Sequence, residues 1–285
     1  MVKLKHLVYN VLPKKMKVVF DRKNFNRNKS NFIKYETIEL LKATPRYTRG
    51  TIKFDQKKIE YLDSASLLFI YDEIFNKQIY NFKTVSQTPI IIDAGANIGM
   101  SLIYFKMKFP NAKITAFEPD EEVFNVLKNN VASFEFKEVE LVKKGLWKEV
   151  TVLTFNSEGA DAGRISDKNE NGKVIKIETS LLSNYLKSNT IDLLKIDIEG
   201  AEFEVLNECK AYLKNVNNIF IEYHSFSGQE QFLPELLGVL KSAGFRLNIN
   251  APGLTSMSPF MKLNEYNGMD MQLNIYGMRK INADL

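Results

Sequence analysis

The 285-residue sequence has little cysteine and no long apolar run. Its single cysteine, Cys209, excludes an internal disulfide and a cluster of thiolate ligands. No apolar run approaches the roughly 18 residues that cross a bilayer, and the first residues lack the apolar core of a signal peptide. These absences predict a protein of the reducing cytoplasm that is soluble or, at most, peripheral to a membrane.

Histidine is almost as scarce, which narrows the search for acid–base chemistry. The two histidines are His6 and His224. His6 lies in a strongly basic segment, and we do not expect it to be catalytic. His224 is therefore the histidine that we consider for proton transfer near neutral pH.

Charge is distributed unevenly along the chain. Residues 1–50 carry 13 Lys and Arg against three acids, a net charge of +10, whereas the remainder carries −5. Such an arm is either solvated or in contact with an anionic partner, such as membrane lipid, a nucleotide-diphosphate sugar or nucleic acid. We expect residues 1–85 to form this basic arm and an α+β cap, and residues 86–285 to form the main domain.

A buried strand leads into a glycine turn at residues 89–100. Three isoleucines at 90–92 precede Asp93, which is typical of a parallel strand buried on both faces. Gly95 and Gly99 let the turn backbone approach a ligand closely, and the helix that follows presents unpaired N–H groups. The pattern predicts a cofactor cradle at the end of this strand.

The cradle lacks the fingerprint of dinucleotide-binding proteins. A Gly-x-Gly-x-x-Gly turn would place glycine where Asn97 and Met100 stand, so no pyrophosphate bay is predicted. Asp93 would instead attract an ammonium or sulfonium group. Glu118 ends the next strand 19 residues after Gly99, near the spacing of an acid that binds ribose hydroxyls. This combination favours S-adenosylmethionine.

Strands and helices alternate along the rest of the chain, which predicts a doubly wound, mostly parallel seven-stranded sheet with right-handed crossovers. The predicted strands of the sheet are 90–93, 113–118, 139–142, 191–197, 218–224, 245–249 and 271–278. The predicted helices between them are 99–109, 120–132, 201–213 and 229–243. For the cap we predict helices at 31–41 and 66–80 and a hairpin of 51–54 with 58–62.

Three segments resemble the FkbM-type S-adenosylmethionine-dependent methyltransferases. They are Ile-Asp-Ala-Gly-Ala-Asn-Ile-Gly at 92–99, Ala-Phe-Glu-Pro at 116–119 and Leu-Lys-Ile-Asp-Ile-Glu-Gly-Ala-Glu at 194–202, within a likeness that covers about residues 88–225. The resemblance implies a Rossmann-like class I methyltransferase fold. Many members of this family methylate a hydroxyl of a sugar or glycan, so the resemblance also implies O-methylation of such a hydroxyl.

Ligands of open α/β sheets bind beyond the carboxyl ends of the strands, which gathers the suspected residues along one edge. Asn97 either orients the methionine carboxylate of the cofactor or caps the helix. The third strand runs on to Gly145, Leu146 and Trp147, where Trp147 or Leu146 either flanks adenine or is a core or hairpin residue. The predicted cofactor-binding residues are Asp93, Gly95, Asn97, Gly99, Glu118, Gly145, Leu146 and Asp197.

Methyl transfer to a hydroxyl needs an aligned acceptor oxygen and a base that removes its proton. His224 is the first candidate, because its unperturbed pKa of about 6.5 suits proton uptake near neutrality. Glu199 and Asp197 are rivals on the same side of extended backbone. The alternatives are a helix-start acid at 199 and a hydrogen-bonded histidine at a strand end. Together with Glu222 these residues could hold Mg²⁺, Ca²⁺ or Mn²⁺, but such carboxylates are common without metal, and we predict none.

Two other functions compete with this interpretation. One is a non-catalytic binding protein that keeps the cradle for stability and docks its arm on an anionic partner. The other is a nucleic-acid methyltransferase that uses the arm for phosphates. The acidic body and the lack of an Asn-Pro-Pro-Tyr motif argue against nucleic acid. The resemblance to the FkbM-type methyltransferases implies a surface glycan, glycolipid or nucleotide-sugar acceptor. We also expect the arm to contact an anionic membrane or a lipid-linked glycan, and we leave a homo-oligomer open.

Overall fold

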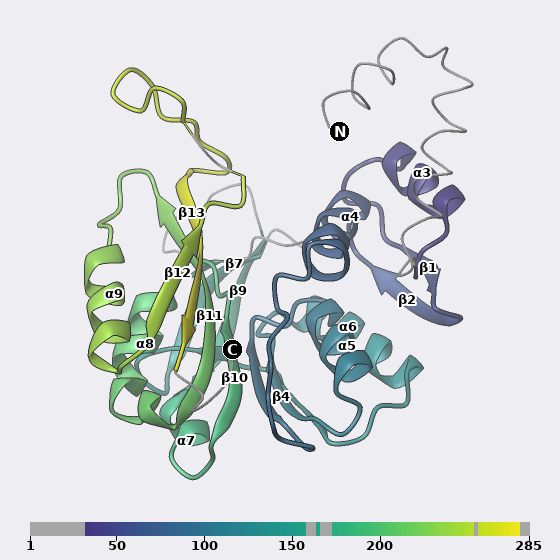
Figure 1. Ribbon diagram of the computed structural model, residues 1–285. Coiled ribbons are helices and arrows are strands. Elements are labelled where there is room, and N and C mark those ends of the chain that lie inside the picture. The colour runs from purple at the N-terminus through teal and green to yellow at the C-terminus, as the bar shows by residue number, and fades with distance from the viewer. Residues whose placement is uncertain (1–31, 158–163, 166–172, 254–255, 280–285) are drawn as a thin grey trace, which may run out of the picture. The chain divides into compact units, whose positions relative to one another are not determined.

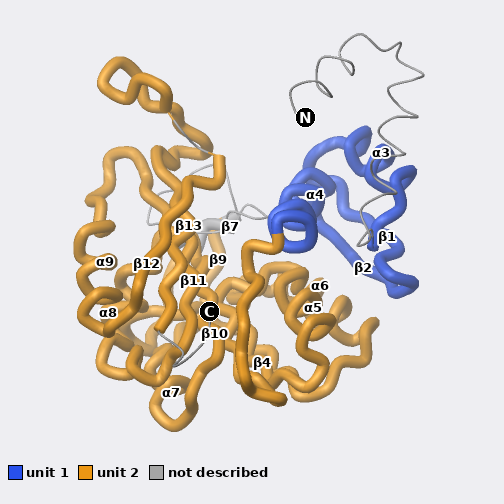
Figure 2. The backbone as a smooth tube through the Cα atoms, viewed as in Figure 1, with its two compact units in different colours: residues 1–77 blue, residues 78–285 orange. Residues whose placement is uncertain are grey.

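A computed structural model describes residues 32–157, 164–165, 173–253 and 256–279 of the chain. The chain divides into two compact units, residues 1–77 and 78–285, which are coloured separately in Figure 2. Most of the predicted basic arm, including His6, lies outside the described residues.

The first unit is an α+β structure, as its residue pattern predicts. Its elements are α3 (Tyr35–Ala43), β1 (Gly50–Phe54), β2 (Lys57–Tyr61), α4 (Ser64–Tyr71) and the π-helical turn η1 (Asp72–Asn76). β1 and β2 form the predicted antiparallel hairpin. Its two turn residues, Asp55 and Gln56, both have positive φ, the conformation of a two-residue turn whose twist matches the strands. The second helical segment ends at Asn76, earlier than predicted.

Seven strands form the central sheet of the second unit, as predicted. They are β3 (Ile90–Ala94), β4 (Lys113–Phe117), β5 (Val139–Val142), β10 (Ile191–Ile196), β11 (Val216–Phe226), β12 (Arg246–Asn250) and β13 (Met269–Met278). Their order is β12-β13-β11-β10-β3-β4-β5. The neighbouring pairs from β11 to β5 are parallel, whereas β13 runs antiparallel to both of its neighbours. β3 and β10 lie side by side at the centre.

Helices cover both faces of this sheet. They are α5 (Met100–Lys108), α6 (Glu121–Ser133), α7 (Ser183–Leu186), α8 (Glu202–Cys209) with the 3₁₀ turn η2 (Lys210–Asn215), and α9 (Leu233–Ser242). The connections through α5 and through α8 leave the centre of the sheet in opposite directions. Right-handed crossovers therefore place α5 and α6 on one face and α8 and α9 on the other (Figure 1). The reversal falls between β3 and β10, where such sheets bind ligands.

No helix in the described ranges is both long and apolar enough to cross a membrane.

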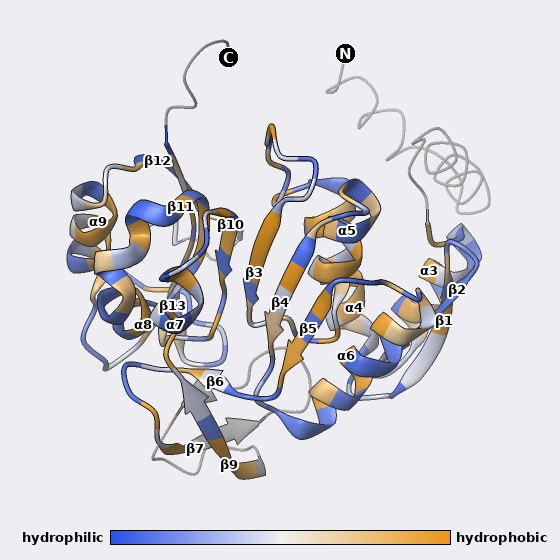
Figure 3. Cartoon of the chain, turned by 90° about the horizontal axis from the view of Figure 1, so that it is seen from below, coloured by the Kyte–Doolittle hydropathy of each residue, from blue (hydrophilic) through white to orange (hydrophobic). Residues whose placement is uncertain are grey.

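The core of the second unit follows from its apolar central strands. All six residues of β10 are buried, and Ile91 and Ile92 of β3 are at most 2 % exposed. Figure 3 shows hydrophobic residues along β3. Each fully buried Ile or Leu side chain contributes roughly 1.5–3 kcal/mol. This burial holds β3 and β10 side by side, and hence the two chain segments that follow them.

A second, smaller sheet lies beside the main one in the same unit. Its order is β6-β9-β7-β8, made of β6 (Gly145–Leu146), β9 (Lys173–Ser180), β7 (Val152–Ser157) and β8 (Arg164–Ile165). β6 pairs parallel with β9, and β7 pairs antiparallel with β9. The chain enters this sheet directly after β5.

The boundary between the units falls after Lys77, whereas we predicted it after residue 85. The residues between these points pack on the main sheet. The Tyr80 ring meets the Phe220 ring edge-on at 4.8 Å. The Thr84 hydroxyl donates to Asp192 at 2.6 Å, and the other oxygen of that carboxylate accepts from the N–H of Ile90. No charge or glycine signal in the sequence marks this packing.

Candidate active site

The turn after β3 is shaped by two glycines that have no room for a side chain. Gly95 has φ +85° and Gly99 has φ +93°, both in the left-handed region. A Cβ on Gly95 would lie 1.8 Å from the carbonyl oxygen of Asp197, and one on Gly99 would lie 2.7 Å from Leu127 Cδ1. Glycine is required at both positions, because it alone combines this conformation with such close packing. The turn is therefore pressed against the end of β10.

Glu118 faces this turn from the end of β4. Its Oε2 accepts a hydrogen bond from the Asn97 N–H at 3.1 Å, and its Oε1 accepts one from the Asp120 N–H at 3.0 Å. Burial, together with the Asp120 charge, raises the pKa of Glu118 to about 8, although the two backbone hydrogen bonds lower it. The side-chain oxygen of Asn97 accepts from the N–H of Ile98 at 2.6 Å. The structure thus brings together Asn97 and Glu118, two of the predicted cofactor-binding residues.

Asp93 is placed beneath the turn rather than at its surface. The residue is 0 % exposed, and its carboxylate accepts from the Ser101 hydroxyl and lies 3.2 Å from Lys195 Nζ. We predicted direct contact between Asp93 and the cofactor. In the structure, Asp93 has no exposed surface. Lys195, which is paired with Asp93 in the register of β10 and β3, fills the space beside the carboxylate.

Lys195 is the structural residue that the sequence reasoning passed over. Its ammonium donates to the carbonyl oxygen of Gly95 at 2.7 Å and lies 3.4 Å from Asp197 Oδ2. Burial lowers its pKa, but the carboxylates of Asp93 and Asp197 outweigh this and raise it to about 12. Lys195 therefore stays charged and ties Asp93 to the turn. The available signal was a lysine in the middle of an apolar strand.

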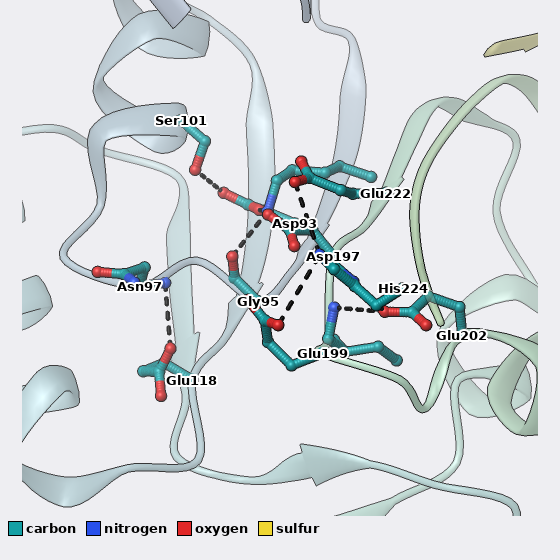
Figure 4. Close-up of polar contacts among 12 residues, drawn as sticks. Asp93, Gly95, Asn97, Ser101, Glu118, Asp197, Glu199, Glu202, Glu222 and His224 are labelled. Carbon is teal, nitrogen blue, oxygen red and sulfur yellow. Dashed lines mark hydrogen bonds and ion pairs between the residues drawn. The ribbon is translucent and has the colours of Figure 1, made fainter. Parts of the chain in front are cut away.

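Beyond the end of β10, four acids surround one histidine (Figure 4). His224 and Glu222 are two residues apart along β11, so their side chains face the same side of the sheet. The His224 side chain is 2 % exposed, with Nε2 3.6 Å from Glu222 Oε1 and 3.8 Å from Glu199 Oε2. One ligand atom each from Asp197, Glu199 and His224 lie within 4.8 Å of one another. The three predicted catalytic residues are therefore brought together. We call Asp197, Glu199, Glu202, Glu222 and His224 the acid–histidine cluster.

Glu202 anchors this cluster, and we assigned it no role from the sequence. It is 1 % exposed, and its Oε1 lies 3.0 Å from His224 Nδ1. The same carboxylate accepts from the backbone N–H groups of Ile198 and Gly200, at 3.3 Å and 3.0 Å. These contacts hold the tight turn in which Glu199 has φ +54° and Gly200 has φ +100°. Its place at the start of α8 was the available signal.

The cluster changes the acid–base properties of its members. Burial lowers the pKa of His224, but the carboxylates of Glu199, Glu202 and Glu222 outweigh it and raise that pKa well above its usual value. Burial and the neighbouring carboxylates raise the pKa of Glu199 to about 8 against the opposing effect of His224. The pKa of Asp197 is also raised, by burial and by Glu222. The neighbouring carboxylates therefore favour the protonated imidazole, whereas our prediction used the unperturbed pKa of histidine.

The predicted adenine wall lies in β6. Leu146 is 3 % exposed and packs in the main core with Phe117 and Leu182. A Cβ on Gly145 would lie 3.0 Å from Ile177 Cδ1 and 3.8 Å from Pro119 Cβ, so Gly145 lies beside the residue that follows Glu118. Leu146 thus takes the alternative role, that of a core residue.

The site has two sides, separated by the turn. Figure 4 shows Asn97 and Glu118 on one side of Gly95, and the acid–histidine cluster on the other. On the first side, the carboxylate of Glu118 can accept hydrogen bonds from hydroxyl groups, and the glycine turn presents its backbone to a ligand. The second offers carboxylate oxygens and an imidazole that can bind a cation or take up a proton.

Known proteins match this part of the chain. The model of the Methyltransferase FkbM domain matches residues 93–247, which include every predicted site residue. Methyltransferase sdnD of Sordaria araneosa is 30 % identical over 234 residues, covering 70 % of this chain and 89 % of that protein. Methyltransferase 1 of Beauveria bassiana is 28 % identical, covering 65 % and 83 %. The 31-O-demethyl-FK506 methyltransferase FkbM of Streptomyces tacrolimicus is 22 % identical, covering 66 % and 85 %.

Proposed function

The chain belongs to the FkbM methyltransferase family, and from this premise we propose that it transfers the methyl group of S-adenosylmethionine to a hydroxyl group. One observation carries the proposal. The turn at Gly95 separates a carboxylate that suits a ribose from a cluster that suits an acceptor hydroxyl, at the point where the strand order reverses. The seven-stranded sheet is that of a Rossmann-like class I methyltransferase.

The first side of the site fits the cofactor. Neither glycine has room for a Cβ, so the turn backbone is fixed by its packing against the end of β10 and against Leu127 of α6. Glu118 would accept hydrogen bonds from the ribose hydroxyls, and Asn97 would hold the turn toward it. Asp93 acts through Lys195, which fixes the Gly95 carbonyl. When bound, S-adenosylmethionine supplies a methyl group on a positively charged sulfur.

The second side fits the acceptor. A hydroxyl that gains a methyl group must lose its proton, and the carboxylates of Asp197 and Glu199 lie together to receive the acceptor. His224 is fixed by Glu202 and acts as a positioning residue for these carboxylates. The three residues that we predicted for catalysis thus keep a place in the proposal, and a carboxylate of the acid–histidine cluster takes up the proton.

The acceptor class rests on resemblance and on relatives. The name of the Streptomyces tacrolimicus relative describes transfer to an oxygen, which supports an oxygen acceptor here. We propose a sugar hydroxyl of a surface glycan, glycolipid or nucleotide-sugar precursor, methylated in the cytoplasm. The net charge of +10 in residues 1–50 supports contact with an anionic membrane or a lipid-linked glycan.

The test combines methyl transfer with cofactor binding. The full chain is incubated with labelled S-adenosylmethionine and a panel of nucleotide sugars, glycan extracts, glycolipids and RNA, and product masses are measured. We expect a mass gain of one methyl group on a sugar. Labelled RNA with no labelled glycan would contradict the acceptor class. Glu118→Ala should abolish cofactor binding in calorimetry, whereas Glu235→Ala, on the exposed face of α9, should bind normally.

A further inference from the structure

We propose that Asp197, Glu199 and His224 bind one divalent metal ion, which holds the acceptor hydroxyl for methyl transfer. This inference rests on the proposed function and names what the acid–histidine cluster does in it. It also replaces our prediction of a site without metal.

The separations of the three side chains suit a single ion. One ligand atom from each lies within 4.8 Å of the others, and His224 Nε2 lies 3.8 Å from Glu199 Oε2. An ion about 2.0–2.3 Å from each ligand places adjacent ligands roughly 3 Å apart and opposite ligands roughly 4.4 Å apart. Small side-chain rotations are enough to bring the three atoms to a common centre.

The histidine points to a ligand independently of the acids. Its Nδ1 is bound to Glu202 Oε1, and Glu202 is itself held by two backbone N–H groups. Nε2 faces the cluster from a side chain that is 2 % exposed, and both neighbouring carboxylates lie beyond hydrogen-bond length. Metal-binding histidines almost always have their second nitrogen fixed in this way by a carboxylate or carbonyl. A buried imidazole nitrogen, whose ring is fixed from the other side, is therefore aimed into the cluster at ion-pair distance from Glu222 and Glu199.

The local charge also favours a cation. Four carboxylates of the cluster lie around His224, at the end of a buried strand. Lys195 lies 3.4 Å from Asp197 but 3.2 Å from Asp93 as well, so two acids share its one charge. Excess negative charge away from water is costly unless it is paired. A doubly charged ion offsets it.

The donor set indicates the class of metal. The donor set is one imidazole with two carboxylates and no thiolate. Such a mixed nitrogen and oxygen set suits Mn²⁺ or Fe²⁺. Glu222, 3.6 Å from His224 Nε2, is left beside the ion. The acceptor oxygen would coordinate the ion and pass its proton to Glu222. The oxygen then bonds to the methyl carbon, while the sulfur keeps the electron pair of the broken C–S bond.

The experiment measures metal binding directly. The chain is stripped with a chelator and titrated with Mn²⁺, followed by calorimetry and by the paramagnetic resonance signal of free Mn²⁺. We expect one Mn²⁺ per chain. Glu199→Gln and His224→Gln should each weaken binding by at least about tenfold. The matched control, Glu235→Gln, should bind as the wild type does. Circular dichroism checks that each variant is folded.

Cofactor calorimetry on the same samples separates this inference from the proposed function. A chain that binds S-adenosylmethionine but neither Mn²⁺ nor Fe²⁺ would overturn the metal site and leave the proposed function standing. Mn²⁺ binding that Glu199→Gln and His224→Gln leave unchanged would place the ion elsewhere and also overturn it. Failure to bind S-adenosylmethionine would instead contradict the proposed function.

Discussion

Glu202 and His224 form a hydrogen-bonded pair of 3.0 Å between the start of α8 and the strand β11, and both side chains are almost fully buried. The pair joins two elements that meet only in the folded state. It fixes the imidazole and, through the N–H groups of Ile198 and Gly200, the turn that carries Glu199. One carboxylate thus sets the geometry of the acid–histidine cluster.

Glu202→Ala should destabilise the fold strongly. The change removes the acceptor of three groups, namely the N–H groups of Ile198 and Gly200 and the Nδ1 of His224. Each buried unpaired group costs about 1–3 kcal/mol. We expect the free energy of unfolding to fall by about 3 kcal/mol or more in a urea titration. Glu204 lies on the same helix as Glu202, and Glu204→Ala removes a partly exposed ion pair with Lys148. This change should cost less than about 1 kcal/mol. Equal losses in the two variants would contradict this role.

Gly95→Ala should destabilise the protein, whereas Gly238→Ala should not. A methyl group at position 95 meets the Asp197 carbonyl in a backbone conformation of positive φ, so we expect a loss of about 3 kcal/mol. Gly238 lies within α9, and a Cβ there meets nothing within 4 Å. Its change to Ala should stabilise the helix by about 0.5–1 kcal/mol. Thermal or urea unfolding of both variants tests the opposite signs.

Lys195→Met should be costly alone and less costly together with Asp93→Asn. Removing the ammonium leaves a fully buried carboxylate uncompensated, which typically costs about 3–5 kcal/mol. The double variant removes that charge as well, so its loss should be smaller than the sum of the single losses. A double-mutant cycle in urea measures this coupling. Additive losses would show that the two side chains do not depend on each other.

Glu118 should make stability fall as the pH rises. Burial raises its folded pKa to about 8, above the usual 4.5, so the folded state binds the proton more tightly than the unfolded state. The stabilising contribution is complete below about pH 4.5 and is lost as the pH rises through about 8. Unfolding free energies measured from pH 5 to 9 should decline less in Glu118→Gln than in the wild type. Parallel curves would contradict the raised pKa.

Much of the fold could be predicted from local patterns. The isoleucines at 90–92 are apolar on both faces of a strand, which indicates a buried parallel strand wherever it lies, and β3 confirms this. The alternation of strands and helices along the chain predicted the doubly wound sheet, because parallel neighbouring strands need a crossover between them. Gly95 and Gly99 were predicted as a turn, and both have the left-handed φ that glycine tolerates.

The roles of the charged residues could not be predicted in this way. Asp93 was a candidate for cofactor contact, but Lys195, from a strand much later in the chain, lies beside it. His224 was judged by its unperturbed pKa, but three carboxylates from the β10–α8 turn, α8 and β11 raise it. Leu146 was offered as an adenine wall and lies in the core.

The sequence by itself determined which segments become strands and helices, because this depends mainly on neighbours along the chain. It also determined which of these segments end in a glycine or an acidic residue. Tertiary structure decided which acids are buried, which are paired and which surround the histidine. Burial and charge interactions act through space over a few ångströms. They depend on a strand order in which β10 lies beside β3.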